Sequence, residues 1–180
     1  MQAARGTSLG PGESDGPSDR DRSRALLVFG VVAVCFYALD LGTKTLAAAR
    51  LEDRPPVRVV GGLLRLTLVR NPGAAFSTGT SYTLVLSLIA IAAAGAVLFY
   101  ARRLQSTVWA VGLGLLLAGV CGNLTDRVFR EPGFLRGHVV DFIELPHWPI
   151  FNVADMSINV AAALIVVQAV RGVSVTGRRS

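Results

Sequence analysis

Two aspartates, Asp141 and Asp155, lie on either side of a short segment that contains two prolines, and the second borders a long apolar run. A carboxylate beside such a run is costly to keep charged and therefore indicates function. The prolines prevent a single unbroken helix from carrying both aspartates, so Asp141 is expected in a connection. Asp155 begins the apolar run 156–170, and Asn152, three residues earlier, occupies a capping position. The spacing predicts that Asp155 lies at a helix N-terminus.

Two carboxylates at one point can divide the work of acid–base catalysis. Like charges a few ångströms apart do not both ionise, so one carboxyl keeps a proton. The ionised carboxylate can then take a proton from water while the protonated one polarises a peptide carbonyl, which is the chemistry of an aspartyl protease. The alternative is structural. Asp141 would then only begin or end an element, and Asp155 would only cap its helix, because Asn-x-x-Asp resembles a capping box.

The composition is that of a small polytopic membrane protein. Of the 180 residues, 52% are hydrophobic and only 17% are charged, whereas a soluble domain carries roughly 25% charged residues. The net charge of +6 does not indicate a nucleic-acid partner, because the arginines flank apolar runs, where they act as topology signals and contact lipid headgroups. Cys35 and Cys121 both fall inside apolar runs, which indicates neither a disulfide nor a metal site.

Four apolar runs are long enough to cross a membrane as helices. We place these helices at about residues 25–49, 82–100, 107–124 and 151–170. The first run could instead be a signal peptide, since arginines precede it and small residues follow it. However, Asp40 and Lys44 separate its apolar core from the candidate cleavage site. Their i,i+4 spacing allows them to neutralise each other, which favours a retained helix.

Polar tails flank the predicted membrane domain, which spans residues 25–171. Residues 1–24 are rich in Gly, Ser, Asp and Arg and contain two prolines. Such a segment has too little apolar surface to fold, so we predict a disordered cytoplasmic tail. Residues 172–180 are predicted to form a second cytoplasmic tail.

A small β-sheet is predicted between the first two helices, at about residues 57–70. Val57–Val60 and Leu63–Val69 flank a Gly-Gly pair, which is the pattern of a two-residue hairpin. Alternate leucines in the second strand give it one apolar face, so we expect the sheet to lie on the extracytoplasmic membrane surface. It ends at Asn71–Phe76, a turn whose small residues allow a ligand or helix to approach closely.

Four spans place both chain termini on one side of the membrane. That side is predicted to be cytoplasmic because the span ends there carry arginines, namely Arg22, Arg24, Arg102, Arg103 and Arg171. On this topology, polar groups from distant parts of the chain meet at the outer face. They are Asn71, Asn123–Arg127, Asp141 and Asp155. In a continuous helix Asn123, Asp126 and Arg127 share one face through their i,i+3,i+4 spacing.

Several of these segments resemble, in chain order, the signature blocks of the lipoprotein signal peptidases, also called signal peptidase II. The blocks are Asn71–Phe76, Gly122–Arg127, Val139–Phe142 and Phe151–Asp155. Asp40–Lys44 is similar to the Asp-x-x-Thr-Lys motif of that family's first helix. The resemblance covers the chain from about Asp40 to Val170, and it implies an α-helical polytopic fold with a small sheet and a surface loop over the site.

The resemblance implies a bacterial inner-membrane aspartyl endopeptidase that removes signal peptides from diacylglyceryl-modified prolipoproteins, cleaving just before the lipidated cysteine. By motif, Asp141 and Asp155 are the catalytic pair. The remaining polar motif residues are expected to bind the substrate backbone, shape the site or support the pair; they are Asn71, Asn123, Asp126, Arg127 and Asn152. For two of them a plain structural role is open, because Asn152 could only cap a helix and Arg127 could only reach for headgroups.

The expected partners are therefore the diacylglyceryl-prolipoprotein and membrane lipids, with the sheet and the loop Phe134–Trp148 clamping the substrate from above. No metal or cofactor is expected, because the chain has no His-Glu-x-x-His motif and no cysteine pair.

Two other function classes fit a membrane protein with carboxylates at the membrane edge. A small transporter subunit would use them as proton relays, although the four spans show no internal repeat. An assembly scaffold would tolerate the loss of either aspartate. Neither class predicts peptide cleavage.

Overall fold

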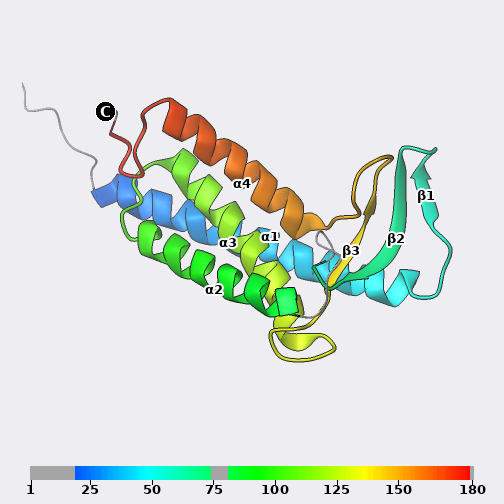
Figure 1. Cartoon of the computed structure of the whole chain (residues 1–180). Coiled ribbons are helices and arrows are strands. Elements are labelled where there is room, and N and C mark those ends of the chain that lie inside the picture. Colours follow the sequence, from blue (N-terminus) through cyan, green and yellow to red (C-terminus); the bar gives the residue numbers. More distant parts are fainter. Residues whose placement is uncertain (1–18, 74–80, 179–180) are drawn as a thin grey trace, which may run out of the picture.

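In the computed structural model, which describes residues 19–73 and 81–178, long helices form a bundle and a small sheet lies at one end of it (Figure 1). The helices are α1 (Asp19–Leu51), α2 (Ser81–Ala101), α3 (Thr107–Phe129) and α4 (Val153–Val170). All four are long and apolar enough to cross a membrane. The α-helical polytopic fold class is confirmed.

Helix α3 is the centre of the bundle, with α1, α4 and α2 packed around it. Its buried positions include several glycines, and these allow close contact between helices. A Cβ atom added at Gly119 would lie 2.5 Å from the carbonyl oxygen of Ala154, and one at Gly114 would lie 2.9 Å from that of Phe29. The glycines therefore let α1 and α4 approach α3 at backbone distance.

The sheet has three antiparallel strands in the order β1 (Val57–Val60), β2 (Leu64–Asn71) and β3 (Val139–Glu144). The hairpin of β1 and β2 was predicted, but its turn has three residues, 61–63, and not two. The third strand was not predicted. The expectation that Asp141 lies in a connection is wrong, because it pairs with Val69 in the middle of the β2–β3 ladder. One face of β3, which carries Val140 and Phe142, belongs to the same buried apolar cluster as Ala47 and Leu51 at the end of α1.

Helices α1 and α3 extend beyond their predicted limits, whereas α4 begins at Val153 and not at residue 151, because Asn152 is its N-cap. Helix α1 begins at Asp19, so residues 19–24 are helical and not part of a disordered tail. Asp19 and Asp21 in its first turn favour this start because they complement the positive end of the helix dipole. Helix α3 continues to Phe129, which places the whole Asn123–Arg127 cluster on a helix. Residues 1–18, 74–80 and 179–180, which include most of the predicted tail and the end of the Asn71–Phe76 turn, lie outside the described residues.

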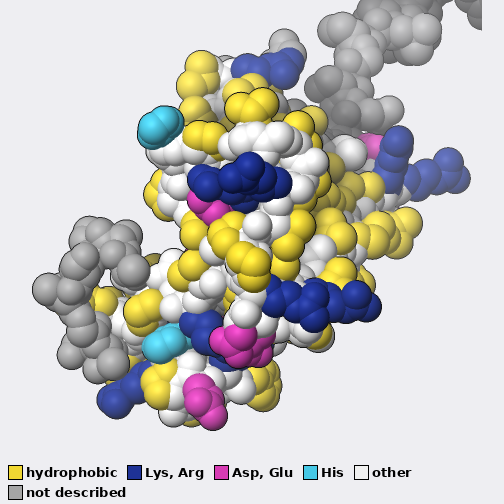
Figure 2. Space-filling view, turned by 90° about the vertical axis from the view of Figure 1, so that its right-hand side faces the viewer, with side chains coloured by type: hydrophobic (Ala, Val, Ile, Leu, Met, Phe, Trp, Pro, Cys, Tyr) yellow, Lys and Arg dark blue, Asp and Glu magenta, His cyan; other side chains and the backbone are white. Residues whose placement is uncertain are grey.

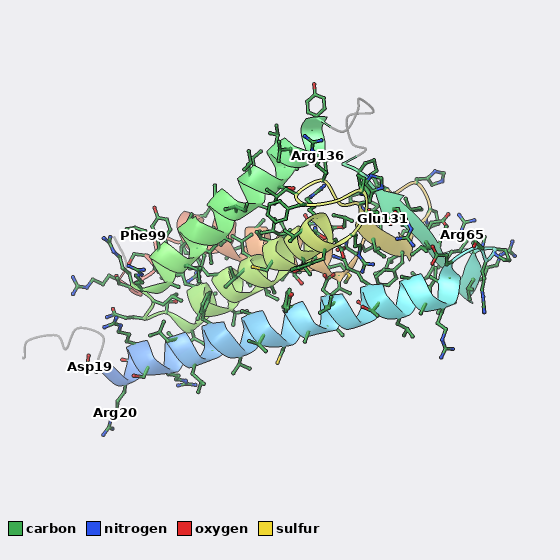
Figure 3. The ribbon with its side chains drawn as sticks, turned by 90° about the horizontal axis from the view of Figure 1, so that it is seen from below. Asp19, Arg20, Arg65, Phe99, Glu131 and Arg136 are labelled. Atoms are coloured by element: carbon green, nitrogen blue, oxygen red, sulfur yellow. The ribbon has the colours of Figure 1, made fainter. Side chains whose placement is uncertain are left out.

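Charged side chains gather at the two ends of the bundle. Asp19 and Arg20 lie at one end, and Arg65, Glu131 and Arg136 lie at the sheet end (Figure 3). Seen from the sheet end, basic, acidic and histidine side chains are interspersed with hydrophobic ones (Figure 2). The start of α1 and the C-terminal segment lie together at the opposite end (Figure 1). This distribution fits an apolar span between two polar surfaces.

Candidate active site

Strands β2 and β3 bring Asn71 next to Asp141. The antiparallel register pairs Asn71 with Val139, and the side-chain amide of Asn71 donates a hydrogen bond of 2.8 Å to Oδ2 of Asp141. The amide oxygen of Asn71 accepts from the backbone N–H of Gly73 at 2.8 Å, which fixes the orientation of the side chain. The carboxylate of Asp141 thus enters the site from the sheet.

Helix α4 supplies the second carboxylate from its first turn. Asn152 is the N-cap, and its side-chain oxygen accepts from the N–H of Asp155 at 2.9 Å. Oδ2 of Asp155 accepts in return from the backbone N–H of Asn152 at 3.2 Å, which completes a capping box. The side-chain amide of Asn152 also donates to Oδ1 of Asp141 at 2.6 Å. The capping residue therefore contacts both aspartates.

Helix α3 holds Asp155 from the other side. The side-chain amide of Asn123 donates to Oδ1 of Asp155 at 2.8 Å. The amide oxygen of Asn123 accepts from Nζ of Lys44 at 2.9 Å and from the side-chain amide of Asn152 at 3.2 Å. Three asparagines from different parts of the chain thus orient the two carboxylates.

A buried charge cluster lies behind these asparagines. Lys44 and Asp40 form the predicted i,i+4 pair at 2.8 Å, and both are almost fully buried. Lys44 also lies 3.1 Å from Oδ2 of Asp126, and this oxygen accepts from the backbone N–H of Val140 in β3 at 3.2 Å. Oδ1 of Asp40 accepts from the N–H of Ala154 at 2.8 Å. The cluster therefore ties α1 and α3 to the strand and the helix that carry the two aspartates.

Arg127 lies close enough to Asp141, Asp126 and Asp155 to be attracted by their charges. Its Nη1 atom is buried and has no hydrogen-bond partner among residues 19–73 and 81–178. Asp126, by contrast, is held by Lys44 and by an ion pair with Nε of Arg130. Asp126 thus supports β3, and Arg127 keeps an unused donor near the aspartates.

Asp141 and Asp155 open into one cleft of about 320 Å³. Its lining consists of Asn71, Asp141, Trp148, Pro149, Ile150, Phe151, Asp155, Ile158 and Asn159. Only 2% of the Asp141 side-chain surface is exposed. Burial raises the pKa of Asp141 from 3.8 to about 6; the charge of Asp155 adds to this effect, whereas hydrogen bonds from Asn71 and Asn152 oppose it. The cleft thus holds two carboxyl groups, one of which keeps a proton more readily than an ordinary aspartate.

Comparison with known proteins decides the family. Residues 32–171 match the family model described as "Signal peptidase (SPase) II". The chain belongs to the signal peptidase II family. The predicted resemblance is confirmed, and the chain is a membrane peptidase of the aspartic, signal peptidase II type. The transporter and scaffold alternatives find no support.

Curated relatives of this signal peptidase II match over most of their length. The "Lipoprotein signal peptidase" of Leifsonia xyli subsp. xyli is 47% identical over 156 residues, which cover 86% of this chain and 72% of the relative. The protein of the same name from Mycobacterium avium is 49% identical over 162 residues, covering 90% of this chain and 88% of the relative. A solved structure described as "Bacterial membrane enzyme structure by the in meso method at 1.9 A resolution" matches with a TM-score of 0.71 and 29% identity, covering 79% of this chain and 92% of the other.

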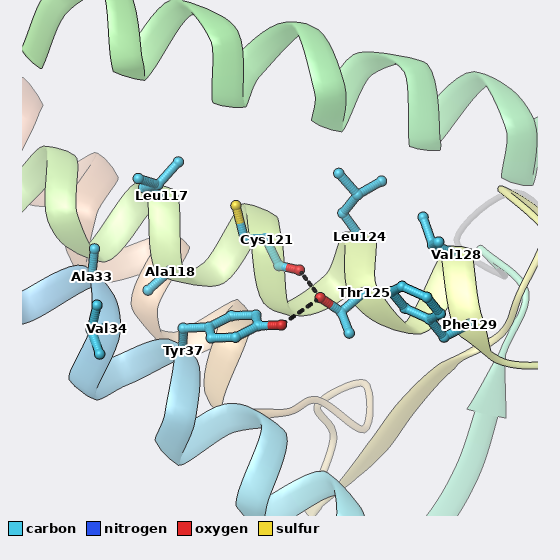
Figure 4. Close-up of a pocket in the computed structure, with 10 residues that line it drawn as sticks. All are labelled: Ala33, Val34, Tyr37, Leu117, Ala118, Cys121, Leu124, Thr125, Val128 and Phe129. Carbon is cyan, nitrogen blue, oxygen red and sulfur yellow. Dashed lines mark hydrogen bonds between the residues drawn. The ribbon is translucent and has the colours of Figure 1, made fainter. Parts of the chain in front are cut away.

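A larger hollow of this signal peptidase II lies between α1 and α3, away from the aspartates, and has a volume of about 480 Å³ (Figure 4). It is lined by Ala33, Val34, Tyr37, Leu117, Ala118, Cys121, Leu124, Thr125, Val128 and Phe129. Its polar groups bond to each other: the hydroxyls of Tyr37 and Thr125 lie 3.0 Å apart, and Thr125 donates to the carbonyl of Cys121 at 2.8 Å. Because no charged side chain lines this hollow, it is not a candidate for acid–base catalysis.

The structure brings the sequence-predicted residues together around the cleft, at increasing distance from it. Asn71, Asp141 and Asp155 line the cleft, Asn123 and Asn152 bond to the aspartates from behind, and Asp126 lies one contact further away. Sequence reasoning missed the bond from Lys44 to Asn123, and it gave no role to Asn159. Among the described residues, no group of three or more His, Cys, Asp or Glu side chains is arranged to hold a metal ion.

Proposed function

We propose that the chain removes signal peptides from prolipoproteins that carry a diacylglyceryl group, and that it cleaves the bond just before the lipidated cysteine. Asp141 and Asp155 are the catalytic pair of this proposal. The observation that carries it is that both carboxylates line one cleft and that Asn152 bonds to both. The family and the names of the curated relatives support the substrate class.

The two aspartates have different surroundings, which supports a division of roles. Burial raises the pKa of Asp141 from 3.8 to about 6, and we therefore assign the shared proton to Asp141 in the proposed reaction. Asp155 lies in the first turn of α4, where the helix dipole stabilises a negative charge. In the proposed reaction Asp155 takes a proton from water, and the water oxygen attacks the peptide carbonyl carbon. Asp141 gives its proton to the carbonyl oxygen, so that a neutral tetrahedral diol forms.

Collapse of this diol breaks the bond between the carbonyl carbon and the nitrogen of the lipidated cysteine. The proton on Asp155 passes to the leaving nitrogen, and a diol hydroxyl returns its proton to Asp141. The pair then holds one proton, as it did before the reaction. Asparagine side chains hold both oxygens of Asp141, Oδ1 by Asn152 and Oδ2 by Asn71. Asn123 holds Oδ1 of Asp155. These bonds preorganise the carboxylates for the transition state.

The cleft also suits an unwound signal peptide. A peptide that unwinds at the membrane edge leaves backbone groups without partners, and the enzyme must supply them. Asn71 and Asn159 are the amide side chains among the residues that line the cleft, so they are available to such backbone groups. Trp148 is 64% exposed and lines the cleft, so the turn after β3 is the part of the loop Phe134–Trp148 that closes over the substrate.

We place both termini in the cytoplasm and the cleft at the outer face of the inner membrane. The arginines at the ends of the spans and the position of the sheet opposite the termini support this orientation. It is tested with an impermeant thiol reagent in intact cells, after Cys35 and Cys121 are replaced by alanine. His147→Cys should be labelled without permeabilisation and Arg103→Cys only after it. The reverse pattern would contradict the orientation.

Cleavage by the purified full-length protein in lipid nanodiscs tests the proposed reaction. The substrate is a prolipoprotein with or without its diacylglyceryl group, and mass spectrometry locates the cut. Asp141→Asn and Asp155→Asn should each lower kcat by about 10²- to 10⁴-fold, as expected for loss of acid–base catalysis. Asp53→Asn is the matched control, because Asp53 is exposed and lies outside the cleft. An inert wild type, or full activity in either cleft variant, would overturn the proposal.

A further inference from the structure

Asn159 places a polar side chain in the cleft one helical turn beyond Asp155. It lies in the apolar helix α4, four residues after Asp155, and lines the same cleft. It is exposed, whereas Ser157 on the same helix is buried and donates to the carbonyl of Val153 at 2.9 Å. The side chain of Asn159 has no hydrogen-bond partner in residues 19–73 or 81–178.

An amide without a partner is unfavourable in the apolar part of a membrane. Polar side chains in spanning helices normally face a protein interior or a water-filled cavity and mark a substrate path. The position of Asn159 in the lining of the catalytic cleft fits that rule. An asparagine side chain both donates and accepts hydrogen bonds, so it can pair with the N–H or the C=O of an extended peptide.

We propose that Asn159 binds the backbone of the signal peptide, on the side that precedes the cleaved bond. This inference rests on the proposed function, since it takes Asp141 and Asp155 as the point of cleavage. Helix α4 runs from the sheet end towards the end that holds the termini, so Asn159 lies deeper along the bundle than Asp155. The membrane-embedded part of a signal peptide lies on that side.

Helix geometry gives the position of the contact in the substrate. Four residues of helix rise about 6 Å, and an extended chain covers about 3.3 Å per residue. Asn159 therefore meets the substrate about two residues before the cleaved bond. Because the bond is to the backbone, it stabilises an unwound segment without selecting a side chain there.

Removal of the Asn159 amide should lower kcat/KM without lowering the stability of the protein. In Asn159→Leu, a leucine of similar size faces the cleft, and we expect an unchanged melting temperature and a kcat/KM lowered about five- to tenfold, the usual effect of one hydrogen bond. Asn159→Ala should show the same loss. Val160→Ala is the matched control, because Val160 is the next residue, is 51% exposed and does not line the cleft.

A second measurement uses substrates in which one backbone amide is replaced by an ester, at each of the four positions before the cysteine. An ester lacks the N–H donor and has a weaker carbonyl acceptor. At about the second position, the ester should lower wild-type kcat/KM by the same five- to tenfold, and Asn159→Leu should cleave the ester and amide substrates equally well.

The outcomes separate this inference from the proposed function. If wild type cleaves, Asp141→Asn is inert and Asn159→Leu equals wild type, the catalytic proposal stands and the role of Asn159 is wrong. The role is also wrong if, at all four positions, the ester lowers kcat/KM in Asn159→Leu by the same factor as in wild type. If wild type does not cleave the lipidated substrate, both proposals fall.

Discussion

The side-chain amide of Asn152 donates a hydrogen bond of 2.6 Å to Oδ1 of Asp141. The same residue exchanges two hydrogen bonds with Asp155 as the N-cap of α4. Asn152 therefore caps a helix and links two carboxylates from different elements. The capping and catalytic interpretations, which are alternatives in the sequence, are compatible in the structure because the cap is what positions Asp155.

Asn152→Ser should separate the two tasks. Serine is a good N-cap, but its shorter side chain cannot cap α4 and reach Asp141 at once. We expect the melting temperature to stay within a few degrees of wild type, and kcat to fall about 10²-fold because the pair is misplaced. Asn152→Ala should lose activity and also about 1 kcal/mol of stability from the missing cap. Wild-type activity in Asn152→Ser, measured in the cleavage assay, would contradict the linking role.

The pH dependence of stability should differ between wild type and Asp141→Asn. The pKa of Asp141 is raised by burial from 3.8 to about 6, so the folded state binds the proton more tightly than the unfolded state does. The stability that this proton supplies is complete below about pH 3.8 and is lost as the pH rises through about 6, with an upper limit of about 3 kcal/mol. The melting temperature of wild type should therefore fall relative to that of Asp141→Asn between about pH 4 and 7. Parallel curves in a thermal scan would refute this.

The pH dependence of activity should depend on Asn71. The active pair holds one proton, so kcat/KM should fall as the pH rises through about 6, where Asp141 ionises in the free enzyme. The hydrogen bond from Asn71 stabilises the ionised carboxylate and lowers its pKa. Asn71→Ala should therefore move the falling limb of the profile to higher pH. A limb that stays in place or moves to lower pH would show that Asn71 does not act on Asp141 in this way.

Lys44→Met should be among the most destabilising single changes in the bundle. The ammonium group is fully buried and lies 2.8 Å from Asp40 and 3.1 Å from Asp126. Its removal leaves buried carboxylates without their counter-charge, which costs about 3–5 kcal/mol. The double variant Lys44→Met with Asp40→Asn should recover part of this loss. Chemical denaturation in detergent measures both, and a double variant no more stable than the single one would contradict the charge argument.

The helices were predicted well from the sequence because a membrane-spanning helix is a long, continuous apolar segment. It can be recognised without knowledge of contacts to distant residues. Strand β3 was missed because Val139–Glu144 is short and its first four residues are all buried, so it lacks the apolar–polar alternation that marks a half-exposed strand. Its pairing with β2 joins residues about 70 positions apart, as in Val69 and Asp141. The start of α1 was also missed, because the polar and charged composition of residues 19–24 is typical of a disordered tail, whereas these residues are helical.

The site residues that belong to sequence motifs were predictable, and those outside the motifs were not. The asparagines at 71, 123 and 152 were expected to support the aspartates, and their side chains bond to them. Lys44 was predicted only as the partner of Asp40, since spacing within one helix cannot show a bond to Asn123 on another. Asn159 belongs to none of the motif blocks, and only its place in the cleft draws attention to it.

Gly119→Ala should disturb the site by moving α4. A Cβ at this position would lie 2.5 Å from the carbonyl oxygen of Ala154 and 2.6 Å from a side-chain carbon of Ile158. Helix α4 must therefore shift away from α3, and Asp155 shifts with it. We expect a loss of about 1–3 kcal/mol of stability and a lower kcat. Gly95→Ala in α2 is the matched control, because its Cβ would meet nothing within 4 Å, and it should be neutral or gain up to about 1 kcal/mol from helix propensity. Equal melting temperatures and equal cleavage rates for the two variants would show that α3 and α4 do not need this close contact.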